Sequence, residues 1–321
     1  MSKTLKILSR PKKNAEEYGR WSVNPFIGCS HGCLYCYLKE GPSGAYLGQD
    51  KPVLKKGVVN REHAYHLAMA EIIENREEII RDGGLFMSFT SDPCAPETRE
   101  LNFRIAANSI DMGVPVTLLT KNASFYQFET LERMLRESPK MNLTEAAQKE
   151  MVKEGMFFMT YFGDLRTKRV KRTVAFGWTL TGHDELESSA DPNAFRLQTM
   201  KRMSQDGFKT WASIEPVIDF PSSLDMIYQA LNAGCEHFKI GLLTNKTRVV
   251  RKDFQIGEHQ FKAYDVRDCL HFIEDVMRMT SGKATVYWKQ SVRDLLGTDL
   301  ETKIDEYPHS VGKNWNMFNN E

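Results

Sequence analysis

The sequence predicts an α/β fold with a parallel sheet, and a full or partial (β/α) barrel is the leading architecture. Short apolar runs alternate with helix-like patterns along the chain, as in repeated strand–helix–strand units. Several helix-like patterns close on a glycine, the usual residue at a left-handed helix end. With 321 residues, the chain can form one barrel-type domain or two smaller domains.

The expected strands are six apolar runs, and helix-like patterns separate them. An additional first strand could occupy residues 22–28, although Pro25 weakens this prediction because proline cannot donate a ladder hydrogen bond. The six strands are expected over residues 85–90, 115–121, 176–182, 210–217, 237–243 and 284–290. The helices are expected over residues 61–81, 98–112, 125–137, 192–206, 222–233 and 265–280.

We expect one domain over residues 1–321, with a core at about 20–290, a short N-terminal extension and a C-terminal extension over 291–321. The composition, with 41% hydrophobic and 26% charged residues, is ordinary for a soluble globular protein. A net charge of +1 gives no overall attraction to nucleic acid. No run approaches the roughly 18 apolar residues of a membrane helix, and no signal peptide is recognisable. A cytoplasmic protein without a membrane partner is therefore expected.

Three of the six cysteines lie close together in the stretch "GCSHGCLYCYL", as Cys29, Cys33 and Cys36. A closed structural zinc site needs four ligands, and His31 in the same tight loop is the local candidate for the fourth. Three thiolates in one loop suit a four-iron four-sulfur cluster better, with its fourth iron left open for a small molecule. A non-enzymatic, cysteine-rich metal-binding module remains the alternative.

The spacing C-x3-C-x2-C, with the aromatic Tyr35 before the third cysteine, resembles the signature of the radical S-adenosylmethionine (SAM) superfamily. The stretch "FTSDP", about fifty residues later, makes the chain most similar to the spore photoproduct lyase branch. The resemblance implies a partial (β/α)6 barrel and a [4Fe–4S] cluster that binds SAM through its open iron. It also implies a lyase that reductively cleaves SAM to a 5′-deoxyadenosyl radical, with an electron from a low-potential donor such as flavodoxin or ferredoxin.

The resemblance also assigns roles to individual residues, which stand at the expected strand ends where such barrels carry their chemistry. It implies iron ligation by the three cysteines, and a place for Tyr35 beside the adenine of SAM. Asp92 has the right charge to pair with the ammonium of SAM. The remaining implied contacts are Thr90 and Ser91 near the amino group, Lys121 at the carboxylate or ribose, Thr179 and Thr181 at the ribose, and Glu215 at the nucleoside or substrate.

One position departs from the branch. Spore photoproduct lyase returns a hydrogen atom from a cysteine just ahead of its Ser-Asp pair, where this chain has Phe89 and Thr90. Cys94 follows the pair and is the nearest thiol that could take this role. Binding of a nucleic acid duplex requires several phosphate contacts from basic residues, and the dense basic cluster is 166–172. DNA as the substrate is therefore possible but less favoured.

The expected fourth and fifth strand ends carry acidic residues, including Asp184 and Glu215. Carboxylates suit a small polar molecule that donates hydrogen bonds, such as the edge of a guanine-like base. Radical SAM lyases similar to this branch include queuine lyase, which converts queuine to a preQ1-type 7-deazaguanine during queuosine salvage. A nucleobase-like substrate and this activity are our leading expectation, with a nucleic-acid-directed lyase as the alternative.

Overall fold

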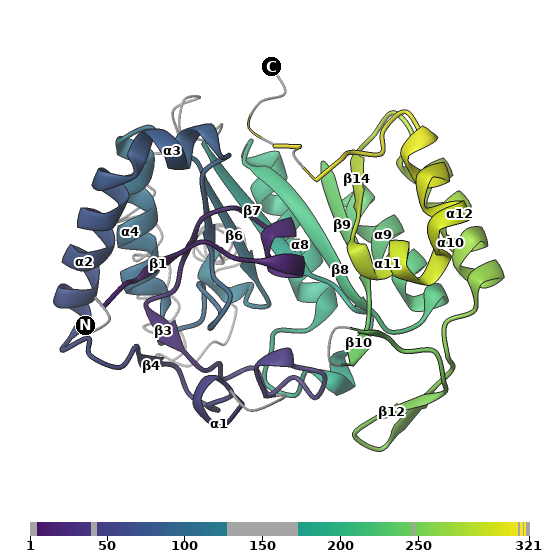
Figure 1. The fold of residues 1–321 in the computed structure, drawn as a ribbon, viewed down its shortest axis with the longest axis horizontal. Coiled ribbons are helices and arrows are strands. Elements are labelled where there is room, and N and C mark those ends of the chain that lie inside the picture. Colours follow the sequence, from purple (N-terminus) through teal and green to yellow (C-terminus); the bar gives the residue numbers. More distant parts are fainter. Residues whose placement is uncertain are drawn as a thin grey trace, which may run out of the picture.

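The computed structural model describes residues 5–39, 44–126, 173–245, 248–313, 315–316 and 318. Its central element is an eight-stranded sheet (Figure 1). In spatial order its strands are β1 (Leu8–Ser9), β2 (Ser22–Val23), β5 (Leu85–Met87), β6 (Val116–Thr120), β7 (Val174–Thr179), β8 (Lys209–Val217), β9 (His237–Leu242) and β14 (Thr285–Trp288). All six strands that the sequence predicts are confirmed.

The sheet is parallel from β2 to β14, and only its edge pair β1–β2 is antiparallel among the described strands. From β5 to β14 the spatial order follows the chain order, as in repeated strand–helix–strand units. All six residues of β7 are buried, which explains why its sequence is continuously apolar rather than alternating. The predicted α/β class with a parallel sheet is therefore confirmed, with β1 and β14 as its two edges.

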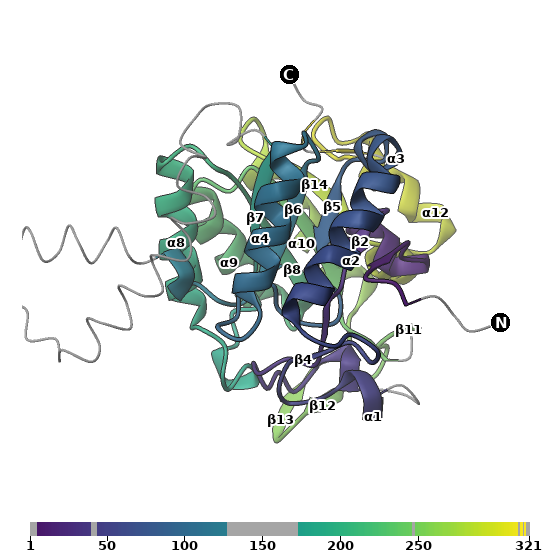
Figure 2. The same cartoon turned by 90° about the vertical axis from the view of Figure 1, so that its left-hand side faces the viewer.

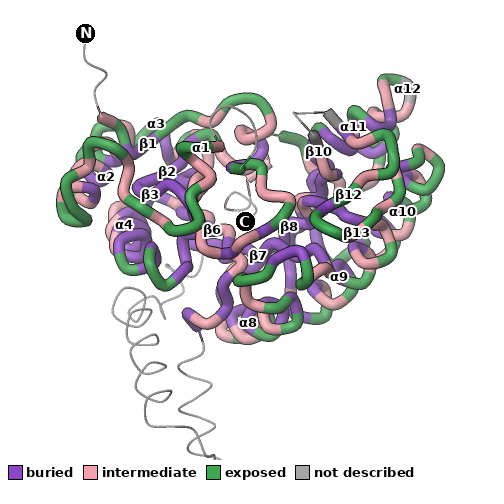
Figure 3. Tube along the Cα trace, turned by 90° about the horizontal axis from the view of Figure 1, so that it is seen from below, coloured by how far each residue is buried: buried purple, intermediate pink, exposed green. Residues whose placement is uncertain are grey.

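Helices cover the outer side of this sheet, as the views along two further axes show (Figures 2 and 3). Side-chain caps begin several of them: Asn60 accepts from His63 N at 2.8 Å, and Asp219 accepts from Ser222 N at 2.8 Å. The longer helices are α2 (Arg61–Glu74), α3 (Arg76–Arg81), α4 (Arg99–Asp111), α8 (Asn193–Gln205), α9 (Phe220–Asn232), α10 (Val266–Thr280) and α11 (Gln290–Leu296). Shorter turns are α1 (Gly44–Leu47), α12 (Thr298–Glu301), η1 (Lys13–Glu17), η2 (Tyr37–Lys39), η3 (Ser124–Tyr126), η5 (Asp184–Leu186) and η6 (Thr302–Glu306).

Two predicted elements are divided in the structure. The helix expected over 61–81 breaks at Asn75, whose side chain donates to the Glu71 carbonyl at 2.8 Å and so competes with the helical pattern. The strand expected over 22–28 is interrupted at Asn24 and Pro25. Its first half joins the main sheet as β2, whereas its second half, β3 (Phe26–Ile27), pairs with β4 (Val53–Leu54).

The small strand pairs lie at the lower side of Figure 1, where the parallel strands end. Besides β3–β4, they are β10 (Thr244–Asn245) with β11 (Arg248–Val249), and β12 (Phe254–Ile256) with β13 (His259–Phe261). The cysteine-rich segment follows β3 directly, so the split of the first strand carries it to this side. The hairpin β12–β13 contributes Ile256 to a small buried cluster that Tyr35 packs against.

Two predictions fall on the part of the chain that the structure does not describe. The basic cluster 166–172 lies outside the described residues, and so does most of the helix expected over 125–137. The single-domain boundaries stay a prediction. No helix among the described residues has the length and apolar character that crossing a membrane would require.

Candidate functional site

The three cysteines of the motif come from one loop and line one hollow. Cys33 is buried, while Cys29 and Cys36 are partly exposed. The loop begins at Gly28 with a φ of 87°, a left-handed conformation that glycine adopts without strain. A side chain there would also collide with the opposite wall, because an added Cβ would lie 2.7 Å from Gln49 Cβ. These constraints fix the direction in which the cysteine loop (residues 28–36) leaves β3.

A second segment, the chain after β7, holds this loop from the other side. The Leu34 amide donates to the Leu186 carbonyl at 2.9 Å, and the Ser189 amide donates to the His31 carbonyl at 3.0 Å. Gly32 lies so close that an added Cβ would be 2.6 Å from Ser188 Oγ. Residues 183–191, which we call the clasp segment, are therefore bonded along the cysteine loop through backbone as well as side chains.

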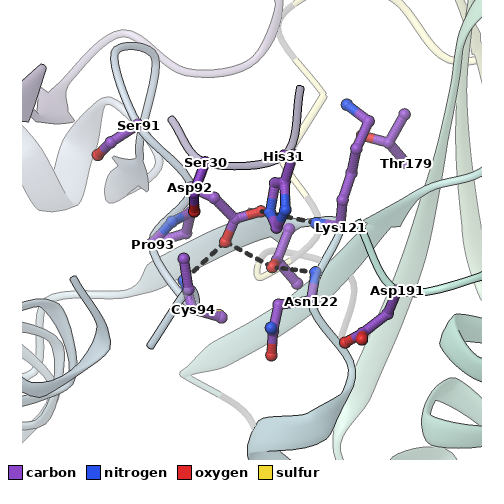
Figure 4. A network of polar contacts seen from close by, with 12 residues as sticks. Ser30, His31, Ser91, Asp92, Pro93, Cys94, Lys121, Asn122, Thr179 and Asp191 are labelled. Carbon is purple, nitrogen blue, oxygen red and sulfur yellow. Dashed lines mark hydrogen bonds and ion pairs between the residues drawn. The ribbon is translucent and has the colours of Figure 1, made fainter. Parts of the chain in front are cut away.

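Asp92 ties the cysteine loop to the ends of β5 and β6 (Figure 4). Its Oδ2 lies 2.8 Å from His31 Nε2 and accepts the Lys121 amide at 2.7 Å. Its Oδ1 accepts the Thr120 hydroxyl at 2.6 Å and the Cys94 amide at 2.8 Å. One buried carboxylate therefore joins three chain segments that lie far apart in the sequence.

These partners also determine the charge of Asp92. Burial alone would raise the pKa of its carboxyl group, but the charge and hydrogen bond of His31 lower it. With the further hydrogen bonds from Thr120 and Lys121, the pKa falls to about 2. Asp92 is thus ionised at neutral pH. All the described contacts of its oxygens are with the protein itself, so pairing with the ammonium of SAM stays a prediction.

A buried ion pair lies behind the cysteine loop. Glu187 and Arg196, both fully buried, are 2.5 Å apart between Oε2 and Nη2. The Tyr35 hydroxyl donates to the other oxygen of Glu187, and Lys121 Nζ lies 3.9 Å from that oxygen. Lys121 also lies over the Tyr35 ring, with its Nζ 5.5 Å from the ring centroid. Glu187 therefore contacts two of the side chains for which the sequence resemblance implies contact with SAM.

Lys121 carries a positive charge beside the cysteines. Burial lowers the pKa of its ammonium group, but the charges of Cys33 and Glu187 raise it and win. Because Glu187 already has Arg196 as a close partner, the three groups together carry one net positive charge. Such a site attracts an anion next to Lys121, although for the thiol of Cys33 burial outweighs this effect and raises the pKa.

The thiols themselves fit a group that supplies positive charge. Burial raises the pKa of Cys29 to about 12 and also raises that of Cys33, so neither thiolate is favoured by the protein alone. Iron in a [4Fe–4S] cluster binds thiolates and would supply this charge. Within the described residues, no group of three histidine, cysteine or acidic side chains is arranged to hold a single metal ion. His31, the candidate fourth zinc ligand, is turned toward Asp92.

The other residues implied at the SAM site have structural partners. Thr90 Oγ1 donates to the Phe26 carbonyl, and Ser91 Oγ lies 3.2 Å from Ser88 Oγ. Thr179 is buried, and its carbonyl accepts from Arg196 Nη1 at 2.9 Å. Thr181 is also buried, and its hydroxyl oxygen accepts the His183 amide at 3.2 Å. Their roles toward SAM stay predictions.

Two residues expected near the substrate are packed or bonded within the protein, and their roles stay predictions. Cys94 is fully buried in the main hydrophobic core, so its thiol faces packed side chains rather than an open surface. This placement gives no support to Cys94 as a hydrogen donor. Asp184 Oδ1 accepts both the backbone and the side-chain amide of Asn193, at 2.7 and 2.6 Å. Asp184 therefore serves the start of α8, a role that its place in an acidic run did not reveal.

Glu215, on β8, belongs to a second polar cluster. Its Oε2 accepts from the Lys289 ammonium at 2.5 Å and from the Tyr18 hydroxyl, while the described residues offer no hydrogen bond to its Oε1. Its side chain is 27% exposed, whereas that of Lys289 is 5% exposed. Gly241 on β9 leaves room for this pair, since an added Cβ would lie 2.9 Å from Glu215 Oε1.

Sequence reasoning therefore singled out the cysteine loop, Asp92 and Lys121, whose roles stay predictions, but it did not identify the residues that bond to them. His31 was considered only as a metal ligand, and Glu187 stands in the acidic run "HDELE" with nothing to distinguish it. Arg196 and Lys289 are basic residues within otherwise ordinary helix and strand patterns. The sequence offered one indication that Arg196 is buried, because its two neighbours, Phe195 and Leu197, are both apolar.

No family model matches the sequence, and no curated protein matches it. Several solved structures match its fold. A cysteine-to-serine variant of spore photoproduct lyase matches with a TM-score of 0.54 at 12% identity, over 89% of this chain and 80% of that chain. A tyrosine-to-phenylalanine variant gives a TM-score of 0.51 at 11% identity, over 87% and 79%. A cysteine-to-alanine variant with dinucleoside spore photoproduct gives 0.51 at 11%, over 88% and 80%.

These matches establish the fold. The chain shares the α/β architecture of spore photoproduct lyase over most of both lengths. The likeness to that branch, which the cysteine motif and "FTSDP" indicated, is thus confirmed at the level of the fold.

Proposed function

We propose that this chain is a radical SAM enzyme in which Cys29, Cys33 and Cys36 hold a [4Fe–4S] cluster. The observation that carries this proposal is that three thiols of one loop line one hollow, and that Asp92 bonds this loop to the end of β6. The shared fold of spore photoproduct lyase supports it. The partial (β/α)6 barrel would be formed by six parallel strands, β5, β6, β7, β8, β9 and β14. The enzyme would work in the cytoplasm.

When bound, the cluster would supply the electron that cleaves SAM to methionine and a 5′-deoxyadenosyl radical. The electron would come from a low-potential donor such as flavodoxin or ferredoxin. Lys121, with its surplus positive charge, would attract the carboxylate of SAM. Tyr35, fixed by Glu187, would lie along the adenine, and Asp92 would hold His31 and the cysteine loop in register with β5 and β6.

For the substrate we propose a small nucleobase, with queuine as the best candidate. Glu215 supports this choice, because its partly exposed carboxylate keeps Oε1 open while Lys289 holds Oε2. A carboxylate held in this way could accept the donors on the edge of a deazaguanine. The second candidate is a lyase directed at nucleic acid, favoured by the bound dinucleoside in one structure of the same fold.

The test is a turnover assay on anaerobically reconstituted protein. We expect about four irons per chain, and 5′-deoxyadenosine release that rises above background when queuine is added. Cys33→Ala should lose both the iron and the cleavage of SAM. The buried Cys235, replaced by alanine, is the matched control, because it lies outside the loop and should keep both.

The outcomes separate the alternatives. Stimulation by ultraviolet-irradiated DNA alone would replace the nucleobase proposal with the nucleic-acid lyase. Bound zinc without any binding of SAM would favour the metal-binding module. Intact turnover in Cys33→Ala would exclude a cluster held by this motif.

A further inference from the structure

We infer that Glu187 is a positioning residue: through its buried carboxylate it sets the places of Tyr35 and Lys121 around the cysteine loop. The inference rests on the proposed function, because it takes the side of the cysteine loop that faces Tyr35 and Lys121 as the place where SAM binds. Neither the sequence motif nor the shared fold assigns a role to Glu187.

The first step is the burial of a charge. Glu187 lies after η5, in a segment without regular structure, yet its side chain has no exposed surface. Burying a carboxylate is costly unless it is paired and hydrogen-bonded. Here Arg196 provides the pair at 2.5 Å, and its Nε and Nη1 are anchored on the carbonyls of Asp191 and Thr179, at 2.6 and 2.9 Å. The position of the carboxylate is thus defined by β7 and α8.

The second step is what the remaining oxygen does. Glu187 Oε1 accepts the Tyr35 hydroxyl and lies 3.9 Å from Lys121 Nζ. Tyr35 is one residue before Cys36, and Lys121 follows β6. A single oxygen therefore relates the cysteine loop to the end of a core strand. Replacing the carboxylate by an amide would weaken the acceptor for Tyr35 and leave Lys121 without its acidic neighbour.

The third step separates this contact from the rest of the clasp segment. The backbone bonds Leu34–Leu186 and Ser189–His31 hold the loop whatever side chain occupies position 187. Loss of the carboxylate should therefore spare the fold of the loop and its iron, and change the placement of two side chains. That is the behaviour of a positioning residue and differs from that of a purely structural one.

The experiment compares Glu187→Gln with Glu185→Gln in the full-length protein. Glu185 is two residues away, is 46% exposed and bonds His183 instead, so it is the matched control. Titration of SAM into the reconstituted proteins should give a dissociation constant at least tenfold higher for Glu187→Gln, with unchanged iron content. Tyr35→Phe should also weaken binding, and the double variant Tyr35→Phe/Glu187→Gln should be no weaker than Glu187→Gln alone.

A second measurement does not depend on SAM. Hydrogen exchange of the unloaded protein should quicken in residues 35–39 for Glu187→Gln but not for Glu185→Gln. Unchanged exchange together with unchanged affinity for SAM would overturn the inference, as would fully additive effects of Tyr35→Phe and Glu187→Gln. If the unsubstituted protein holds iron but binds no SAM, the proposed function fails, and exchange alone then decides whether Glu187 positions Tyr35.

Discussion

At the residue scale, the site depends on a few buried charges whose partners are remote in the sequence. Asp92 was predictable as a polar strand end, and its acidity suggested an ammonium partner. Its neighbours within the protein include His31 and Thr120, which are 61 and 28 residues away. A spacing pattern reports which side chains share a loop or a face, but not which distant segment will satisfy a buried charge. The same limit hid Glu187 and Arg196.

Asp92 supplies a prediction about stability. In Asp92→Asn, a neutral amide replaces a carboxylate that four donors surround. We expect the free energy of unfolding to fall by about 1.5–3 kcal/mol, the range for a hydrogen bond to a charged group. The pKa of Asp92 is depressed to about 2, so its contribution is present above the unfolded value near 3.8 and is lost as the pH falls toward 2.

Urea unfolding at pH 6 and pH 3 measures this effect. The difference in the free energy of unfolding between the unsubstituted protein and Asp92→Asn should be larger at pH 6 than at pH 3. Asp50→Asn, which removes an exposed partner of Lys39, is the control and should change little at either pH. Equal stability of Asp92→Asn and the unsubstituted protein at pH 6 would contradict the assigned hydrogen bonds.

At the element scale, the sequence predicted which elements exist better than where they break. The six strands were recognisable because buried parallel strands are short, continuously apolar runs. The break at Asn75 coincides with a bond of its side chain to the preceding turn, and at the other break Asn24 accepts the amide of Phe89 from a remote segment. Both breaks leave the apolar pattern almost unchanged. The second break matters for function, since it turns the chain out of the main sheet just before Cys29.

One histidine, His183, contacts several elements near the carboxyl ends of the parallel strands. His183 lies 2.6 Å from Asp219, the N-cap of α9, and 2.7 Å from Glu185 in η5. Its ring also meets the edge of Phe261 in the hairpin β12–β13, with centroids 5.4 Å apart. The hydrogen bond of Asp219, followed by that of Glu185, raises the pKa of His183 despite partial burial.

A pH-dependent stability follows from this raised pKa. The contribution of protonated His183 is fully present below the unfolded value near 6.5 and is lost as the pH rises through the folded value. We expect His183→Gln to lower the melting temperature more at pH 6 than at pH 9, measured by thermal unfolding at both values. His66→Gln, on the exposed surface of α2, is the control. A pH-independent loss in His183→Gln would mean that packing, not charge, holds the hairpin.

At the scale of the whole molecule, the fold class was accessible from the sequence and the cofactor could be proposed from it, whereas nothing in the sequence determined the substrate. Cysteine spacing and strand periodicity are local features. A substrate is recognised by side chains from several strands, such as Glu215 on β8 with Lys289 after β14, and their pairing depends on the sheet order. The sequence could place Glu215 at a strand end, but it could not show that Lys289 and Tyr18 hold one of its two oxygens.

The N-terminal segment meets the last strand of the sheet in one buried contact. Glu17, in η1 near the N-terminus, accepts the Tyr287 hydroxyl at 2.9 Å and the Gln290 amide at 2.7 Å, and its other oxygen lies 3.7 Å from Lys289 Nζ. These partners are about 270 residues away and lie on or beside β14, the edge strand of the sheet. Glu17 thus fixes the N-terminal segment against the last strand.

The last prediction concerns this closure. Glu17→Ala leaves Lys289 with one acidic neighbour fewer and the Tyr287 hydroxyl without its acceptor, both in buried surroundings. We expect a loss of about 2–4 kcal/mol in the free energy of unfolding, because breaking a buried charge contact is far more costly than losing an exposed one. Glu16→Ala is the adjacent control. It removes a surface pair with Lys313 and should cost less than about 1 kcal/mol. Urea unfolding of both variants measures these losses in the free energy of unfolding. Equal losses in Glu17→Ala and Glu16→Ala would show that the N-terminal segment is not fixed by Glu17.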